Sequence, residues 1–423
     1  MHYPSLRPAA IGCWLFLLLL FRCPTFAADF FEPRGELTLA DAIASALRQN
    51  PALRSADFDV RIASANTAQA ARRRNPELGL SVENFGAGSG DATRETTLSL
   101  AQVIELGGKR GLREEVARQN RDLRAIERES KQLDVLADVT RRFIDVAALQ
   151  QQLLLARRSS GLAEQTLGAI SARVAAARTP RSEQYRAEIL LGRTRLEARQ
   201  SEQALLSAHR RLAALWGSTE PRFGDVSADL FELPPVASFD ALFTQLSANP
   251  ELLRFASEAR LRDAEWQLAL AGAKTDITLG GGLRRFEDSG KTGFVVSVSM
   301  PLPIADRNRD AIHAAALRRE QVDSEREAAL LAAQATLFEF HQTLLQDRAT
   351  VTTLREQLIP QAEAALEQTQ YGYQRGRFSF IELADAQREL IALQRDAIAA
   401  AANFHRTRAE IERLTNAPLA LQE

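Results

Sequence analysis

The sequence predicts a mainly α-helical protein with membrane β-strands, built from a duplicated helix–β-hairpin–helix unit. Long segments place apolar residues every three or four positions, as packed helices do, and two short segments alternate apolar with small or polar residues, as β-hairpins do. Both patterns recur later in the chain, where Asn249-Pro250 repeats Asn50-Pro51 at an offset of 250 − 51 = 199 positions. A repeat of this length indicates duplication of one structural unit.

The composition narrows the possible function classes. The chain has 423 residues and a formal net charge of −1, so it lacks the basic field that is typical of nucleic-acid-binding proteins. After residue 27, no apolar run approaches the roughly 20 residues that a membrane-spanning helix needs. If the chain enters a membrane, we therefore expect it to do so through strands.

Residues 1–27 have the pattern of a secretory signal peptide. Arg7 precedes a short apolar core, and Thr25 and Ala27 supply small residues at the expected cleavage site. Cys13 and Cys23 both lie in this segment, so we expect no disulfide and no thiolate metal site in the mature chain. Arg22 is an unfavourable neighbour for a lipid-modified Cys23, which favours simple cleavage over a lipid anchor.

The first unit is expected over residues 28–217. Thr38-Leu-Ala-Asp41 has a capping-box pattern that opens a helix, and Asn50-Pro51 interrupts that helix. After a hairpin at residues 77–103, a helical pattern without proline runs through residues 112–179. Two apolar stripes along this segment predict contact with helices on both sides. A turn at Pro180 leads into the last helix of the unit.

The second unit is expected over residues 238–417, after a proline-containing connector at residues 218–237 and before a C-terminal tail at residues 418–423. Its hairpin occupies residues 276–301. The second strands of the two hairpins match better one position out of register, where Leu98 and Leu100 correspond to Val296 and Val298. A bulge would explain the shift, and so would a wrong choice of face.

The four strands have the length and alternation of membrane barrel strands, which cross a bilayer in roughly 9–11 tilted residues. The apolar positions expected to face lipid are Leu78, Leu80, Val82, Leu98, Leu100, Ile277, Leu279, Phe294, Val296 and Val298. The alternative is a pair of exposed hairpins on a soluble domain. Four strands cannot close a barrel, because known membrane barrels start at about eight strands. The pattern therefore predicts a barrel shared between two or three chains.

Several segments resemble the outer-membrane channel tunnels of tripartite efflux systems, and most of all their cobalt–zinc–cadmium resistance branch. They are LTLADAIASALRQNPAL, NPELGLSVENF, QVIELGGKRGLREEVA, PLPIADRNRDAIHAAA, YGYQRGRFSFIELADAQREL and FHRTRAEIERLTN. The resemblance implies a homotrimer whose 12-strand β-barrel, in the Gram-negative outer membrane, is continuous with a 12-helix α-barrel tunnel in the periplasm. It also implies a periplasmic adaptor (membrane fusion protein) and an inner-membrane resistance–nodulation–division pump as partners.

The turn between the last two predicted helices holds the candidate aperture. Gly376 can end one helix, and Ser379 and Glu382 form a capping box for the next. The resemblance places Glu382 and Asp385 at the closed aperture of the tunnel, where rings of carboxylates would favour cations. The alternative is that both acids only stabilise the helix N-terminus. In the first unit the same positions hold Glu183 and Arg186, and an Arg186 pair with Asp385 or Glu382 would lock the aperture.

The exposed turns at the same end are candidate docking points for the adaptor, through Arg178, Arg181, Gly376 and Arg377. The alternative is ordinary solvated loops. At the other end of the helices, residues 107–110 and 306–309 follow the strands directly. Their glycines permit a bend and their Lys and Arg side chains can reach lipid headgroups, so they are interpreted as structural.

No enzyme, cofactor or metal site is expected. The histidines His209, His313, His341 and His405 have no metal-ligand spacing, and no nucleophile or phosphate-binding motif is present. The resemblance to the cobalt–zinc–cadmium resistance branch implies a passive outer-membrane exit duct for divalent heavy-metal cations, such as Co, Zn and Cd or Ni and Cu. The alternatives are a duct for drugs or secreted polypeptides and, from another class, a periplasmic coiled-coil adaptor.

Overall fold

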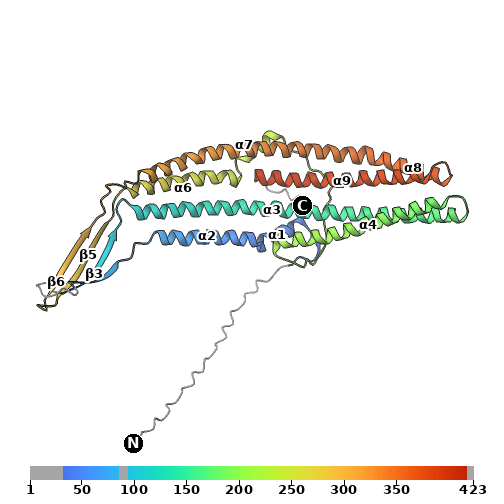
Figure 1. Cartoon of the computed structure of the whole chain (residues 1–423). Coiled ribbons are helices and arrows are strands. Elements are labelled where there is room, and N and C mark those ends of the chain that lie inside the picture. The colour runs from blue at the N-terminus through green and yellow to red at the C-terminus, as the bar shows by residue number, and fades with distance from the viewer. Residues whose placement is uncertain (1–31, 85–93, 417–423) are drawn as a thin grey trace, which may run out of the picture. The chain divides into compact units, whose positions relative to one another are not determined.

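The computed structural model describes residues 32–84 and 94–416, and the residues from Glu32 onward form one compact unit. The predicted signal peptide, the turn of the first hairpin at residues 85–93 and the C-terminal tail lie outside the described residues. Long helices run side by side, and the four strands of the larger sheet lie together at one end of them (Figure 1). Among the described residues, no helix is both long and apolar enough to cross a membrane.

The helices of the first unit lie close to the predicted segments, and α1 and α2 begin at their predicted capping residues. They are α1 (Leu39–Gln49), α2 (Pro51–Ala70), α3 (Lys109–Ala175), α4 (Arg181–Ala213) and the 3-10 turn η1 (Ala214–Trp216). Thr38 caps α1 by accepting the N–H of Asp41. Asn50 caps α2 in the same way, with Pro51 at the first helical position, where its missing N–H costs nothing.

The second unit repeats this order with one change. Its helices are α5 (Phe239–Leu246), α6 (Pro250–Gly272), α7 (Arg309–Thr353), α8 (Ile359–Gln374) and α9 (Phe380–Thr415). A π-helical turn, η2 (Leu354–Leu358), separates α7 from α8. Pro360 lies two residues after its end, and proline can neither donate a hydrogen bond to the preceding turn nor fit against the carbonyl group there. The wider π turn accommodates that ring, whereas α3 of the first unit continues without a break.

In each unit an asparagine at the equivalent position joins the beginning of the unit to its end. Asn50 Nδ2 donates to the Leu215 carbonyl oxygen at 2.8 Å, and Asn249 Nδ2 donates to the Leu414 carbonyl oxygen at 2.7 Å. Both bonds join the start of a helix near the beginning of the unit to the end of its last helix. The offset of 199 positions that relates Asn50 to Asn249 also relates Leu215 to Leu414 (414 − 215 = 199), so the duplication extends to tertiary contacts.

The four predicted strands form one antiparallel sheet of order β2-β3-β5-β6. The strands are β2 (Glu77–Glu83), β3 (Glu95–Ile104), β5 (Ile277–Phe286) and β6 (Thr292–Ser299). Leu80 pairs with Leu98, and Leu279 pairs with Val298, in ladders without a register shift. By these pairings Leu98 corresponds to Val298, at an offset of 298 − 98 = 200 positions, because the second hairpin holds one more residue. The predicted correspondence of Leu98 to Val296 is therefore wrong, and the paired residues of these strands show neither a bulge nor a change of face.

The connector forms structure that sequence patterns did not predict. Its strand β4 (Phe223–Val226) pairs in parallel with β1 (Gly35–Leu37). Further along, the Leu230 carbonyl oxygen lies 3.0 Å from His405 Nε2, and the Ala237 carbonyl oxygen lies 3.1 Å from His341 Nε2. The connector therefore contacts α9 and α7 through these two histidine side chains.

Helix α3 lies at the centre of the packing. It contacts α2, α4, α6 and α9, as its two apolar stripes predict. Val139 and Val146, which lie on one of these two stripes, are fully buried in the largest hydrophobic cluster, together with Trp216. Leu154, which lies on the other stripe, differs from the expectation, because 64% of its surface is exposed.

Candidate functional site

The two helical turns far from the sheet pack against each other. Ile170 and Ala187 of the α3–α4 hairpin form one buried cluster with Tyr373, Phe380 and other residues of the α8–α9 hairpin. Arg173 crosses between them, with its Nη1 donating to the Tyr373 carbonyl oxygen at 2.8 Å and its guanidinium 4.8 Å from the centre of the Tyr373 ring. The structure thus brings the two predicted tips together within one chain.

Both tips use a left-handed residue to end the helix. Gly376 has φ +74°, and Ala177 has φ +57° at the corresponding position of the first unit. Sequence reasoning missed a second glycine requirement at this turn. A Cβ at Gly372 would overlap the ring of Phe378, so the absence of a side chain lets the aromatic ring cover the helix end. The Tyr-Gly-Tyr sequence at residues 371–373 was the available signal.

Glu382 forms the predicted capping box. Its Oε2 accepts the backbone N–H of Ser379 at 2.7 Å and the Ser379 hydroxyl at 2.8 Å, while its own N–H donates to Ser379 Oγ at 3.3 Å. The hydrogen bond from the Ser379 N–H, followed by the one from its hydroxyl, lowers the pKa of the Glu382 carboxyl. The side chain is therefore a fixed anion at neutral pH.

The other candidate aperture residues do not meet within one chain. Asp385 pairs with Arg388 one turn further along α9. Arg186 is exposed, and within the described residues it forms no ion pair with Glu382 or Asp385. Burial raises the pKa of the Tyr373 phenol, and the nearby charge of Glu183 raises that pKa further. Their role in an aperture stays a prediction.

The tip arginines are available to a partner. Arg178, Arg181 and Arg377 are exposed. Arg375 is also exposed, with its guanidinium 4.1 Å from the centre of the Tyr371 ring. Side chains at the end of a rigid helical hairpin, held by a buried cluster beneath them, offer a pre-organised basic surface. Docking through this surface stays a prediction.

The sheet has one apolar face and one polar face. All ten strand residues predicted to face lipid fall on the same face in the observed ladders, and Phe294, Val296 and Leu78 are exposed by 90%, 83% and 74%. On the other face, Arg284 Nη1 lies 2.7 Å from Glu95 Oε2, and its Nε donates to Thr97 Oγ1 at 3.0 Å. The arrangement separates a surface suited to hydrocarbon from one suited to water.

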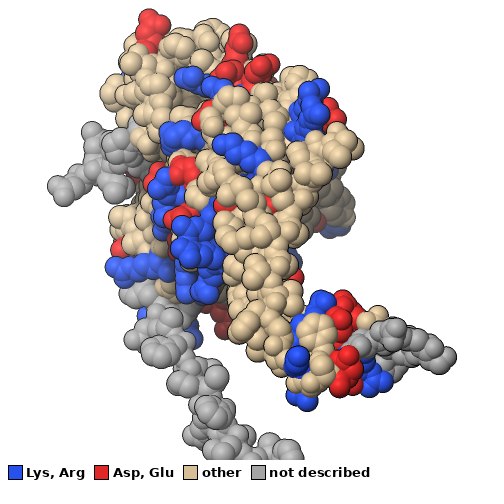
Figure 2. Space-filling view, turned by 90° about the vertical axis from the view of Figure 1, so that its left-hand side faces the viewer, with Lys and Arg blue, Asp and Glu red and all other residues tan. Residues whose placement is uncertain are grey.

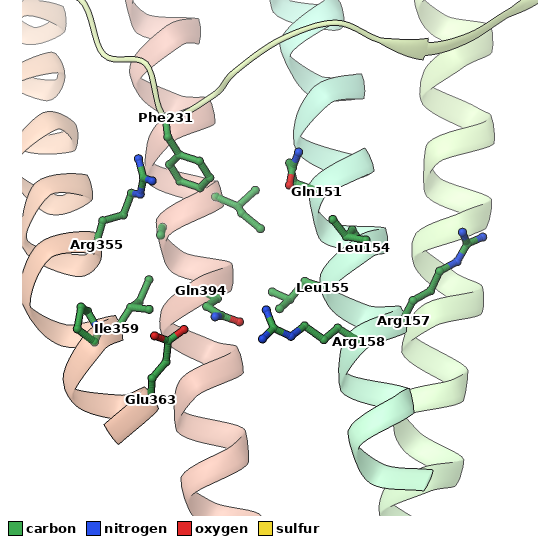
Figure 3. Close-up of a pocket in the computed structure, with 13 residues that line it drawn as sticks. Gln151, Leu154, Leu155, Arg157, Arg158, Phe231, Arg355, Ile359, Glu363 and Gln394 are labelled. Carbon is green, nitrogen blue, oxygen red and sulfur yellow. The ribbon is translucent and has the colours of Figure 1, made fainter. Parts of the chain in front are cut away.

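A pocket of about 690 Å³ lies between α3, α9 and the η2–α8 segment, and sequence reasoning missed it. Figure 3 shows Arg158 and Glu363 reaching into it from opposite sides, with the apolar side chain of Leu155 above them in this view. The connector covers one end, where the Arg355 guanidinium lies 4.5 Å from the centre of the Phe231 ring. The π turn positions Arg355, so Pro360 in an otherwise helical pattern was the signal that could have indicated it.

Comparison with known proteins agrees with this geometry. The family model described as "Outer membrane efflux protein" matches residues 42–218 and 244–417. The cobalt-zinc-cadmium resistance protein CzcC of Cupriavidus metallidurans is 29% identical over 85% of both chains. The nickel and cobalt resistance protein CnrC of the same organism is 28% identical over 78% of both chains.

Solved structures share the fold. A membrane protein from Pseudomonas aeruginosa has a TM-score of 0.74 at 20% identity, covering 89% of this chain and 93% of that one. The MtrE outer membrane channel of Neisseria gonorrhoeae, solved in its open state, has a TM-score of 0.72 at 19% identity, covering 89% of this chain and 88% of that one.

Proposed function

The chain belongs to the outer membrane efflux protein family, and on that premise we propose that it is the passive exit duct of a heavy-metal efflux system. The proposed cargo is divalent cations of the cobalt, zinc, cadmium, nickel and copper group. The assignment of this cargo rests on the similarity to CzcC over 85% of both chains. Family and fold are those of outer-membrane transport proteins, which sets aside the alternative of a periplasmic adaptor.

A homotrimer is the assembly that we propose. Within the described residues, one chain supplies four strands to this sheet, with β2 and β6 as open edges and an outer face that is mainly apolar. Open sheet edges are not tolerated in hydrocarbon, because their N–H and C=O groups would have no partner. Three copies would supply twelve strands and leave a wide interior, with the polar face of each sheet turned toward water.

We place the periplasmic aperture at the helical tips, with Glu382, Asp385, Glu183 and Arg186 around it. The tip arginines would bind a periplasmic adaptor that connects the duct to an inner-membrane proton-driven pump. Support comes from the fixed charge of Glu382 and from the rigid cluster beneath the turns. Carboxylate rings in a pore favour cations. We keep residues 28–217 and 238–417 as the two units, joined by the connector at 218–237.

Deletion of the gene tests this function. The deletion strain is expected to become sensitive to at least one of zinc, cadmium, cobalt, nickel and copper, and a plasmid copy is expected to restore growth. Sensitivity to drugs alone, with unchanged metal tolerance, would instead support the alternative of a drug duct. Fractionation provides the control, because the complementing protein should be recovered as a trimer from washed outer membranes.

A further inference from the structure

A band of exposed cations surrounds the passage between strands and helices. Where α2, α3, α6 and α7 meet the sheet, the segments 71–76, 105–113, 273–276 and 305–310 hold nine Lys or Arg residues against four Asp or Glu residues. Lys and Arg side chains gather on this end of the described structure, beside the strands (Figure 2). The excess positive charge is local, because the whole chain carries a formal net charge of −1.

Two of the four carboxylates in these segments already form ion pairs with three of the nine cations. Glu105 accepts from Arg113 and lies 3.5 Å from Arg74 Nε, while Asp276 lies 2.7 Å from Lys109 Nζ. The remaining six cations are exposed and form no ion pair within residues 32–84 and 94–416. We call them the junction cations, and they are Arg72, Arg73, Arg110, Lys274, Arg307 and Arg309.

The junction is rigidly built. Asp276 Oδ1 also accepts the Leu106 N–H at 3.1 Å, which ties the end of one hairpin to the start of the other. Asn308, with φ +60°, starts α7 and donates from Nδ2 to the Ala269 carbonyl oxygen at 2.6 Å. Gly107 and Gly108 take φ +76° and +73°, which allows the chain to bend directly into α3. The backbone positions of the cations are therefore fixed relative to the sheet.

Exposed apolar side chains lead from the sheet to these cations. Ile104 is 42% exposed at the end of β3, and Leu302 and Ile304 are 67% and 78% exposed after β6. Arg307 follows only three residues after Ile304. A hydrocarbon-compatible surface that ends in a row of cations has the order of a lipid leaflet, in which acyl chains end at the headgroups.

We propose that the junction cations bind the phosphate groups of anionic phospholipids in the periplasmic leaflet of the outer membrane. The inference rests on the proposed function, because it requires the sheet to lie in that membrane with its helices in the periplasm. Phosphatidylglycerol and cardiolipin are the occupants that fit. Guanidinium groups pair with phosphate oxygens through parallel hydrogen bonds, and within the described residues no carboxylate forms an ion pair with the junction cations.

Native mass spectrometry of the purified trimer tests the proposal. The trimer is released from mixed micelles with equal amounts of phosphatidylglycerol and phosphatidylcholine. The test variant carries R72Q, R73Q, R307Q and R309Q. The matched control carries R178Q, R181Q, R375Q and R377Q, which removes the same charge at the helical tips. Because the substituted side chains of the test variant are exposed and unpaired in the described chain, it is expected to fold.

Wild type and control are expected to retain about fivefold or more phosphatidylglycerol than phosphatidylcholine. The test variant is expected to retain the two lipids in nearly equal amounts. Equal retention of both lipids by the wild type would overturn the proposal, as would an unchanged preference in the test variant. Recovery of wild type in washed outer membranes is scored separately. Its absence there would contradict the proposed function, whereas presence without lipid preference would contradict only this inference.

Discussion

The capping box at the tip of α9 allows the structural and the proposed electrostatic roles of Glu382 to be separated. Ser379→Ala removes the hydroxyl that accepts the Glu382 N–H, but it leaves the carboxylate charge in place. Glu382→Gln removes the charge, but glutamine at this position can still accept the Ser379 N–H. The two variants therefore change one property each at a single turn.

The known cost of losing an N-cap gives the expected size of the effect of Ser379→Ala on hydrogen exchange. Loss of a serine N-cap costs about 1 kcal/mol, which corresponds to roughly fivefold faster hydrogen exchange where the amides exchange by local opening. Ser379→Ala should therefore accelerate exchange in the first turn of α9, and Glu382→Gln should do so much less. The segment to monitor begins at Phe380.

Channel recordings give the second readout. If Glu382 contributes to a carboxylate ring, Glu382→Gln should shift the reversal potential in a salt gradient toward lower cation preference, and Ser379→Ala should not. An unchanged reversal potential in Glu382→Gln, together with accelerated exchange in Ser379→Ala, would refute the gating role and leave Glu382 as a cap alone. A shift in both variants would mean that the two roles cannot be separated.

Three further predictions concern other parts of the chain. Gly372→Ala should destabilise the tip by about 1–3 kcal/mol, because its Cβ overlaps the Phe378 ring, and thermal unfolding should show partial recovery when Phe378→Ala is added. Burial lowers the pKa of His405, so on acidification the unfolded chain takes up the proton at a higher pH than the folded chain does. The contribution of His405 to the free energy of unfolding should therefore be fully present above about pH 6.5 and be lost as the pH drops below it. His405→Gln should flatten this pH dependence in unfolding measured between pH 5 and 8. Phe294→Lys on the apolar face should cost about 2–4 kcal/mol if that face lies in lipid, and reduce recovery from outer membranes, whereas Ser297→Lys on the polar face should be tolerated.

Features encoded within a few residues could be predicted from the sequence. The N-cap at Thr38, the capping box at Ser379, the Asn-Pro helix starts and the alternation in all four strands each lie within one turn or one strand. Their physical causes are local hydrogen bonds and side-chain periodicity, so the helices, the hairpins and the common apolar face were all expected.

Features that depend on distant contacts could not be predicted in the same way. The parallel pairing of β1 with β4 joins residues almost 190 positions apart, with strands of only three and four residues. The Gly372–Phe378 contact and the Arg355–Phe231 contact depend on how turns and the connector fold back on the helices. The offset of 200 positions between Leu98 and Val298 became visible only from the ladders, because an insertion in a hairpin leaves no periodic signal.

The sheet order has a consequence for how copies of the chain would assemble into the proposed homotrimer. The two edge strands of the described sheet, β2 and β6, come from different units and differ in sequence. A β2 edge that meets a β6 edge continues the antiparallel alternation, so copies add head to tail rather than by two-fold pairing. Every open intermediate then keeps one edge of each kind, whatever its size. Only ring closure removes both, and assembly in the membrane is therefore expected to pass directly from separate chains to a closed ring, without a stable dimer.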